Sequence, residues 1–141
     1  EDLRAIFRQK TGPTVKQALV NARVGQGCFR TNVLEFWDHR CAVTGSAASD
    51  VIRASHIKPW RHSDNSERLD PQNGLPLTAN LDALFDAGLI SFEPSGNMIV
   101  SSRLDASDRV VFSVENRVLR KTPSESMSKY LEFHLVSVFR Q

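Results

Sequence analysis

The chain has 141 residues, the size of one domain, and 40% of them are hydrophobic, which supports a modest core. A net charge of +2 is too small to indicate nucleic-acid binding by itself, and no run of about 18 apolar residues predicts a membrane span. The chain opens at Glu1 and shows no basic and apolar leader. We therefore expect a cytoplasmic protein and a piece of a longer polypeptide.

The first third of the chain is predicted to be helical. Residues 1–10 are expected to form a short helix, and a second helix is predicted from a cap at Thr14 to about Arg23. After Gly25, apolar residues recur at steps of three and four, which indicates a third, amphipathic helix. The residues of this apolar stripe are Phe29, Val33, Leu34 and Trp37.

The pattern changes at Cys41. An apolar run over 41–45 and a β-prone run over 51–57 are separated by small polar residues, so we expect these two runs to pair as a hairpin. Residues 61–72 are polar and are predicted to form a loop. A helix is expected over 78–87, with Gly88 as its C-cap.

The last third combines a hairpin and a helix. Residues 89–92 and 98–101 flank a Pro-Ser-Gly-Asn turn and are predicted to form a second hairpin, and 110–112 are expected to add a strand. A final helix is predicted to start at Pro123 and to end near Phe139. This order of elements predicts an α+β domain with a small antiparallel β element.

The two cysteines, Cys28 and Cys41, are thirteen positions apart (41 − 28) and form no C-x-x-C pair. The sequence therefore encodes no structural zinc knuckle. Apolar neighbours predict that both cysteines are small buried thiols. A chain without a disulfide framework agrees with a cytoplasmic location.

The residues suited to phosphodiester chemistry lie in three segments, 54–60, 73–77 and 81–86. His56 ends a predicted strand, and a neutral imidazole there can take a proton from water near physiological pH. Asp82 and Asp86 are four positions apart, so both carboxylates extend from one face of a helix and suit Mg²⁺ or Mn²⁺. The amide of Asn73 is expected to tie down the loop and to fix how His56 is presented.

Phosphodiester cleavage needs a base that activates water, a cation that stabilises charge on the phosphate, and a rigid geometry. Lys58 and Arg53 are expected to add positive charge around the phosphate. Basic residues also outnumber acidic ones in the first thirty positions, which is typical of a phosphate-binding face and equally of a solvated helix surface. These basic residues are Arg4, Arg8, Lys10, Lys16, Arg23 and Arg30.

The three segments together resemble the HNH endonuclease family, in the branch found in bacterial restriction and anti-phage defence proteins. The resemblance rests on Ser-His-Ile-Lys-Pro-Trp at 55–60, Asn-Gly-Leu-Pro-Leu at 73–77 and Leu-Asp-Ala-Leu-Phe-Asp-Ala-Gly-Leu-Ile at 81–90. The flanking runs 23–30, 40–45 and 130–140 are similar to the lead-in and closing helix of that branch. The resemblance therefore covers nearly the whole chain from about residue 20.

This resemblance implies an α+β fold with a ββα-metal core, in which a β-hairpin, a loop and a helix surround one divalent metal, Mg²⁺ or Mn²⁺. It implies a single domain over 1–141, with a helical lead-in over 1–38, the core over 40–88, and a hairpin with a closing helix over 89–141. It also implies that His56 is the general base, that Asn73 holds the loop and His56 in place, and that Asp82 binds the metal, nine positions after Asn73 (82 − 73). Asp86 would be the further ligand that some members use, such as the colicin nucleases.

Two departures from the family pattern affect the coordination set. Ser55 stands where many members carry Asp or His as a second metal ligand, and Asp82 stands where the family has its last His. A catalytically inactive nucleic-acid-binding module therefore stays open as an alternative, and the low net charge leaves open a purely structural domain. Asp86 also has an alternative role, in bonding to backbone groups near the end of its helix.

The partner expected from the resemblance is DNA, with Arg30, Arg53 and Lys58 as the predicted contacts. A sensor or recognition domain, fused or separate, is expected to supply sequence or modification preference, because a metal site reads phosphate and no bases. A homodimer would let two sites cut both strands. The side chains expected to serve packing or the surface rather than catalysis are His39, His62, His134, Trp37 and Trp60.

Overall fold

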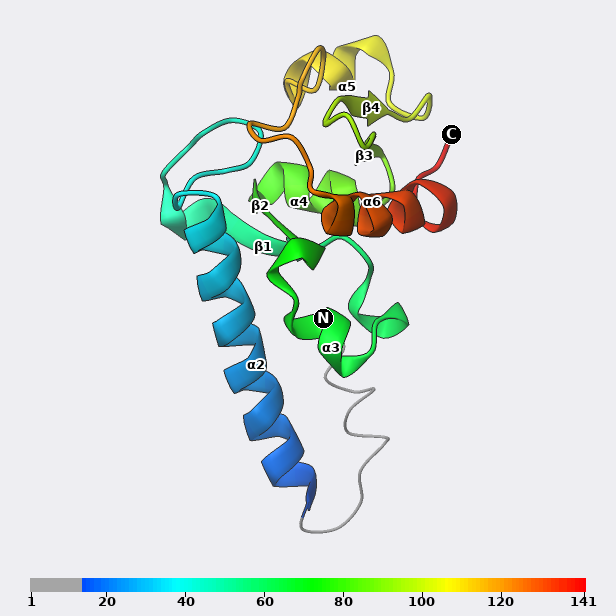
Figure 1. Cartoon of the computed structure of the whole chain (residues 1–141). Helices are drawn as coiled ribbons and strands as arrows, with labels where there is room; N and C mark the ends of the chain where they lie inside the picture. Colours follow the sequence, from blue (N-terminus) through cyan, green and yellow to red (C-terminus); the bar gives the residue numbers. More distant parts are fainter. Residues whose placement is uncertain (1–13) are drawn as a thin grey trace.

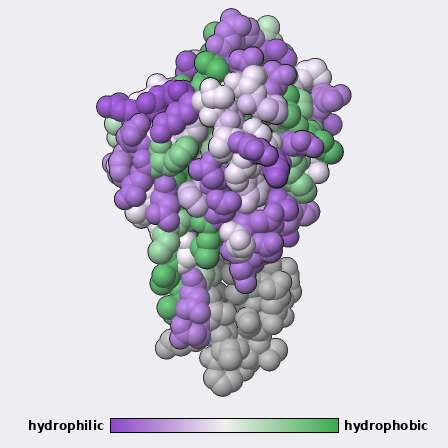
Figure 2. Space-filling model, viewed as in Figure 1, coloured by the Kyte–Doolittle hydropathy of each residue, from purple (hydrophilic) through white to green (hydrophobic). Residues whose placement is uncertain are grey.

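A computed structural model describes residues 14–141, so the helix predicted over 1–10 lies outside the described residues. Figure 1 shows a long helix, α2, that extends away from a body made of the remaining elements. Along the extended part of this helix, Figure 2 shows apolar surface beside polar surface. Within the described range, no helix combines the length and apolarity that crossing a bilayer requires.

Helix α2 (Thr14–Phe36) is continuous, so the two helices predicted on either side of Gly25 are one. A single Gly costs a helix about 1 kcal/mol relative to Ala, and burial of an apolar stripe exceeds that cost. The stripe predicted from the sequence supplies it, because Phe29, Val33 and Trp37 are each at most 2% exposed. Tertiary packing of this stripe therefore keeps α2 helical through Gly25 and Gly27.

The first sheet pairs β1 (Ile52–His56) with β2 (Gly74–Thr78) in antiparallel register, and His56 lies opposite Gly74. The predicted pairing of 51–57 with 41–45 is therefore wrong, since 41–45 form a turn, buried over 41–43, against the outer edge of β2. The amide of Ala42 donates to the carbonyl of Pro76 at 2.7 Å. Pro76 thus has its missing N–H on the outer edge rather than toward β1, which is where a sheet tolerates proline.

The long connection between β1 and β2 is more ordered than the predicted polar loop. It contains the 3₁₀ turns η2 (Trp60–His62) and η3 (Pro71–Asn73) and a short helix, α3 (Asn65–Leu69). Asp64 caps α3 through a reciprocal capping box with Glu67. Local capping therefore gives structure to a segment whose polarity alone indicates a loop. A 3₁₀ turn, η1 (Ser49–Val51), precedes β1.

The helix and hairpin predicted after β2 are confirmed. Helix α4 (Ala79–Asp86) follows β2 directly. It is terminated two residues later by Gly88, whose φ of 74° favours glycine. Strands β3 (Ile90–Phe92) and β4 (Met98–Val100) form the second antiparallel pair. The order β1, connection, β2 and α4 gives the chain its α+β core.

The strand predicted over 110–112 is wrong. Those residues end helix α5 (Ala106–Val111), which Asp105 caps by accepting a hydrogen bond from the amide of Asp108 at 2.8 Å. Val110 and Val111 are largely exposed there. Because no strand of the described residues packs against them, their β propensity does not decide the local structure.

The closing helix, α6 (Glu125–Ser137), is confirmed, with Ser124 as its N-cap. It buries Met127, Leu131 and His134 against the core. The core joins α2, both strands of the first sheet, α4, the second hairpin and α6, so the elements that carry the predicted site share one packed interior. Cys41 lies in this core, whereas Cys28 is exposed, which corrects the prediction of two buried thiols.

Gly74 is required by a close approach between α2 and β2. A Cβ atom at this position would lie 2.5 Å from Cγ2 of Val33 and 2.6 Å from Cζ of Phe29. At Gly27, by contrast, an added Cβ atom meets none of the described residues within 4 Å. The two glycines therefore make a matched pair for testing this approach.

We expect Gly74→Ala to lower the free energy of unfolding by about 1–3 kcal/mol, because α2 must shift to admit the methyl group. Gly27→Ala is expected to keep or raise stability, since Ala favours the helix. Urea unfolding monitored by circular dichroism measures both. Equal midpoints for Gly74→Ala and the wild type would contradict the close packing.

Candidate active site

A pocket of about 790 Å³ opens beside the end of β1 and brings several predicted site residues together. His56, Asp82 and Asp86 all line it, and so do Arg30 and Arg53. Two predicted residues do not: Lys58 and Asn73 lie outside the lining. The pocket is walled by α2, β1, η2 and α4, with contributions from α6.

His56 is partly buried, and its contacts include one backbone carbonyl and two aromatic rings. Its Nε2 lies 2.8 Å from the backbone carbonyl oxygen of Arg68. The Phe29 ring stacks on the imidazole, with centroids 3.8 Å apart and planes 6° apart. The Trp60 ring meets it edge-on at 5.6 Å. The two aromatic contacts and the hydrogen bond at Nε2 therefore restrict rotation of the imidazole.

The hydrogen bond to Arg68 also fixes which nitrogen of His56 carries the proton. A carbonyl oxygen can only accept, so Nε2 is the donor and bears the hydrogen. In the neutral ring, Nδ1 then holds the lone pair. The arrangement presents Nδ1 as the basic atom of this histidine.

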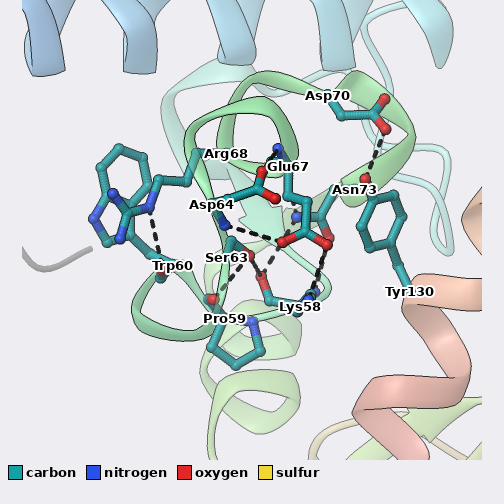
Figure 3. Close-up of polar contacts among 10 residues, drawn as sticks. All are labelled: Lys58, Pro59, Trp60, Ser63, Asp64, Glu67, Arg68, Asp70, Asn73 and Tyr130. Carbon is teal, nitrogen blue, oxygen red and sulfur yellow. Dashed lines mark hydrogen bonds and ion pairs between the residues drawn. The ribbon is translucent and has the colours of Figure 1, made fainter.

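Arg68 is itself anchored, although nothing in the sequence marked it as a site residue. Its guanidinium is nearly buried, donates from Nε to the Trp60 carbonyl at 3.1 Å, and lies 4.6 Å from the centroid of the Trp60 ring. This contact folds α3 back onto the turn that follows β1, as Figure 3 shows. The carbonyl that holds His56 is therefore fixed by its own side chain.

Asn73 joins the two ends of the connection and is fully buried. Its Oδ1 accepts from the amide of Lys58 at 2.8 Å, and its Nδ2 donates to the carbonyl of Glu67 at 3.0 Å (Figure 3). The amide of Ile57 donates to the backbone carbonyl of Asn73 at 3.0 Å. Asn73 thus ties the residues just after His56 to α3 and to the start of β2.

Lys58, a predicted nucleic-acid contact, has its ammonium paired with Glu67. Lys58 Nζ lies 2.8 Å from Glu67 Oε2 and 5.1 Å from the centroid of the Phe133 ring. The hydrogen bond from Lys58, followed by that from the Asp64 amide, lowers the pKa of Glu67 below its usual value. Lys58 therefore braces the connection in this structure, which positions it away from the pocket.

Asp70 and Tyr130 attach the connection to α6. The Tyr130 hydroxyl donates to Asp70 Oδ2 at 2.8 Å, and Asp70 Oδ1 accepts from the amide of Gln72 (Figure 3 shows the tyrosine contact). Burial, and then the neighbouring Asp70 carboxylate, raise the pKa of the Tyr130 hydroxyl. The tyrosine is therefore a neutral donor across the physiological range.

Asp82 and Asp86 lie one turn apart on α4 and both line the pocket, as their spacing predicts. Asp82 is partly buried and Asp86 is exposed. Ser55, which also lines the pocket, is buried, and its hydroxyl has no hydrogen-bond partner among the described residues. Within residues 14–141, no group of three or more His, Cys, Asp or Glu side chains is placed to hold a metal ion.

The two carboxylates fit a hydrated hard cation better than a closed cage. Mg²⁺ keeps several water ligands and is commonly bound by one or two carboxylates together with phosphate oxygens. Asp82 and Asp86 offer that donor set from one helix face. They do not match structural zinc, which takes four protein ligands from cysteine and histidine.

Arg30 and Arg53 contribute positive charge to the pocket. Arg30 donates from Nη1 to the carbonyl of Ile52 at 2.9 Å, which attaches α2 to the start of β1. Arg53 is exposed on β1 and donates from Nη1 to the carbonyl of Asp50 at 3.3 Å. Both guanidinium groups are held near the pocket by backbone oxygens and not by carboxylates.

Comparison with known families assigns this core. Residues 41–93 match the model of the HNH endonuclease family, a segment that contains β1, the connection, β2, α4 and β3. These residues are an HNH segment. The segment is thus similar to nucleases of the HNH type, and its bounds include His56, Asn73, Asp82 and Asp86. A search of curated proteins returns no match.

Phe29 and Arg30 lie outside the HNH segment, on α2. The sequence predicted Phe29 as a core residue from its helical spacing, and periodicity holds no signal for its stack on His56. Arg23 and Arg61 also line the pocket and were not predicted as site residues. For the α2 residues, the available signal was the run 23–30, in which Arg23, Phe29 and Arg30 all line the pocket.

His134 supports α4 from α6. It is buried, its Nε2 donates to the carbonyl of Phe85 at 2.9 Å, and its ring stacks on Phe85 with centroids 3.9 Å apart. Its Nδ1 lies 2.7 Å from the Ser91 hydroxyl, which makes Ser91 the donor. Burial lowers the pKa of His134 to about 4. The neutral ring therefore packs beneath the helix that carries Asp82 and Asp86.

This burial makes stability depend on pH. The unfolded chain binds a proton at His134 below about pH 6.5, and the folded protein does so only near pH 4. The His134 contribution to the free energy of unfolding should therefore fall by about 3 kcal/mol between these values. Urea unfolding at pH 7, 6, 5 and 4 measures the decline as pH falls.

His134→Gln should flatten this pH dependence, whereas His62→Gln should keep it, because His62 is exposed. A wild-type slope that the His134 substitution leaves unchanged would contradict the assignment.

Proposed function

We propose that the chain is a metal-dependent DNA endonuclease that hydrolyses phosphodiester bonds with His56 as general base. The proposal is supported above all by one observation. A single pocket is lined by an imidazole of fixed tautomer and by two carboxylates from one helix face, within a segment of the HNH family. These are the groups that hydrolysis of a phosphodiester needs.

In the proposed reaction, His56 Nδ1 removes a proton from the water that attacks phosphorus. A phosphorus–oxygen bond to that water forms as the bond to the leaving oxygen breaks. The imidazolium that results keeps its Nε2–H bonded to the Arg68 carbonyl and lies against the Phe29 face, where a ring stabilises positive charge. Asn73 acts as a positioning residue, because it holds the connection from which the Arg68 carbonyl extends.

Asp82, and Asp86 with it, would hold one divalent cation, Mg²⁺ or Mn²⁺. When bound, such an ion supplies Lewis-acid stabilisation of the charge on the phosphate and on the leaving oxygen. The guanidinium groups of Arg30 and Arg53 would add charge stabilisation at the phosphate. The role of the cation is thus separate from the proton transfer at His56.

A role in restriction or anti-phage defence, a cytoplasmic location, a sensor or recognition domain and a homodimer stay predictions that rest on the sequence alone. A second candidate function is a catalytically inactive module that binds nucleic acid. It is favoured by Ser55 at a family ligand position and by the small number of metal ligands among the described residues.

A plasmid-nicking assay with Mg²⁺ or Mn²⁺ tests the proposed chemistry. The wild type should convert supercoiled plasmid to nicked or linear DNA, and a chelator should stop the reaction. His56→Ala should lower the cleavage rate by roughly 10²–10⁴-fold, because it removes the general base. Asp82→Ala should also abolish or greatly slow cleavage.

His39→Asn is the matched control. His39 is exposed, lies outside the pocket and has a φ of 58°, which asparagine adopts readily. This variant should cleave like the wild type. Undiminished cleavage by His56→Ala would overturn the mechanism. Salt-dependent DNA binding by a wild type that cleaves with none of several divalent metals would support the inactive module instead.

A further inference from the structure

The charge of the pocket extends beyond the groups that the proposed chemistry uses. Asp82 and Asp86 are the acidic residues that line it, and the remaining permanently charged lining residues are Arg23, Arg30, Arg53 and Arg61. No ion pair found among residues 14–141 involves any of these four arginines. With the carboxylates assigned to a cation, the remaining permanently charged side chains of the pocket are all positive.

Two of the four arginines come from α2 and share one face of it. Arg23 and Arg30 are seven residues apart (30 − 23), so they lie two turns apart, and Gly27 lies between them on the same face. Seven residues of helix rise about 10 Å, close to the rise of three nucleotides in a DNA strand at about 3.4 Å each. The spacing therefore suits contacts to successive parts of one strand.

Among residues 14–141, nothing in the packing explains Gly27. It lies inside a helix, where alanine would be more stable, and a Cβ atom there would meet no described residue within 4 Å. Gly25 differs, since its added Cβ atom would meet Leu69 at 3.1 Å. A glycine that internal packing does not require, on the wall of a positive pocket, lets another molecule approach the helix backbone closely.

The arginines at the other end of the pocket flank His56. Arg53 lies on β1, three residues before His56, and Arg61 lies on η2, five residues after it. Arg30 is fixed by its bond to Ile52, so α2 and β1 are held at a set separation across the pocket. The four arginines thus line the same pocket as His56, from α2, β1 and η2, and the α2 wall lies outside the HNH segment.

We propose that the face of α2 formed by Arg23, Gly27 and Arg30 binds the backbone of duplex DNA and, with Arg53 and Arg61, guides one strand across His56. This inference rests on the proposed function and adds the surface that holds the substrate. Guanidinium groups bind phosphate oxygens in pairs, and sequence-independent contacts of this kind give affinity that falls with salt.

The first test measures binding without cleavage, in the full chain carrying His56→Ala. Fluorescence anisotropy with a labelled duplex oligonucleotide gives the dissociation constant over a range of salt concentrations. Each phosphate contact that is lost should reduce the slope of log affinity against log salt by roughly 0.9. Arg23→Ala and Arg61→Ala should each show that reduction and weaken binding at low salt.

Arg103→Ala is the control, because Arg103 is exposed and does not line the pocket. It should leave the slope unchanged. If Arg23→Ala and Arg61→Ala also leave the slope unchanged, the α2 surface is wrong, while cleavage by the wild type would still stand. Tighter binding to an RNA duplex of the same sequence would overturn the assignment of DNA as the ligand.

The second test uses Gly27, where a structural role and a binding role predict opposite results. Gly27→Ala should melt at the same or a higher temperature than its parent. Gly27→Leu should stay folded, since its Cβ atom meets no described residue within 4 Å, and should bind the duplex at least tenfold more weakly. Unchanged duplex affinity in Gly27→Leu would overturn the proposed close approach to α2.

Discussion

The hydrogen bond between His56 Nε2 and the carbonyl of Arg68 is the interaction on which the site depends. It sets the tautomer of the imidazole, and so it decides which nitrogen can take a proton. A backbone carbonyl can hold a ring at this point only if its own segment is rigid. The connection from 57 to 73 is rigid because Asn73 bonds both of its ends, Asp64 caps α3, and the Arg68 side chain is anchored on Trp60.

A second constraint is the close packing of α2 against the β1–β2 pair. Gly74 lies opposite His56 and leaves the space that the Phe29 ring occupies, and that ring stacks on the imidazole. The HNH segment therefore receives one face of its histidine pocket from a helix outside the segment. The same helix carries Arg30, which is bonded to β1. The position of α2 therefore determines both the packing of the core and the orientation of the His56 ring.

Sequence reasoning selected three residues that line one pocket, but it did not predict the pairing of the strands beside it. The i,i+4 spacing of Asp82 and Asp86 and the motif around His56 were enough to place three residues on one pocket, because helix periodicity and a strand end are local properties. The partner of β1 was predicted wrongly, because Pro76 argues against a strand over 74–78. The polarity of 61–72 likewise indicates a loop where α3 forms. The roles of Arg68 and Phe29 could not be predicted, because one acts through its backbone carbonyl and the other through a contact between distant elements. Lys58 was expected at the phosphate on charge alone, and its pairing with Glu67 is decided by the fold of the connection.

The most direct measurement of the central claim is the tautomer of His56. Long-range proton–nitrogen NMR correlations of the labelled protein, at a pH where the imidazole is neutral, distinguish a protonated ring nitrogen from one that carries a lone pair. His56→Ala identifies the signals of this residue. The account predicts that Nε2 bears the proton and that Nδ1 carries the lone pair. A neutral ring protonated at Nδ1 would contradict it, because the bond to Arg68 would then lack a donor and the proposed base would already hold its proton.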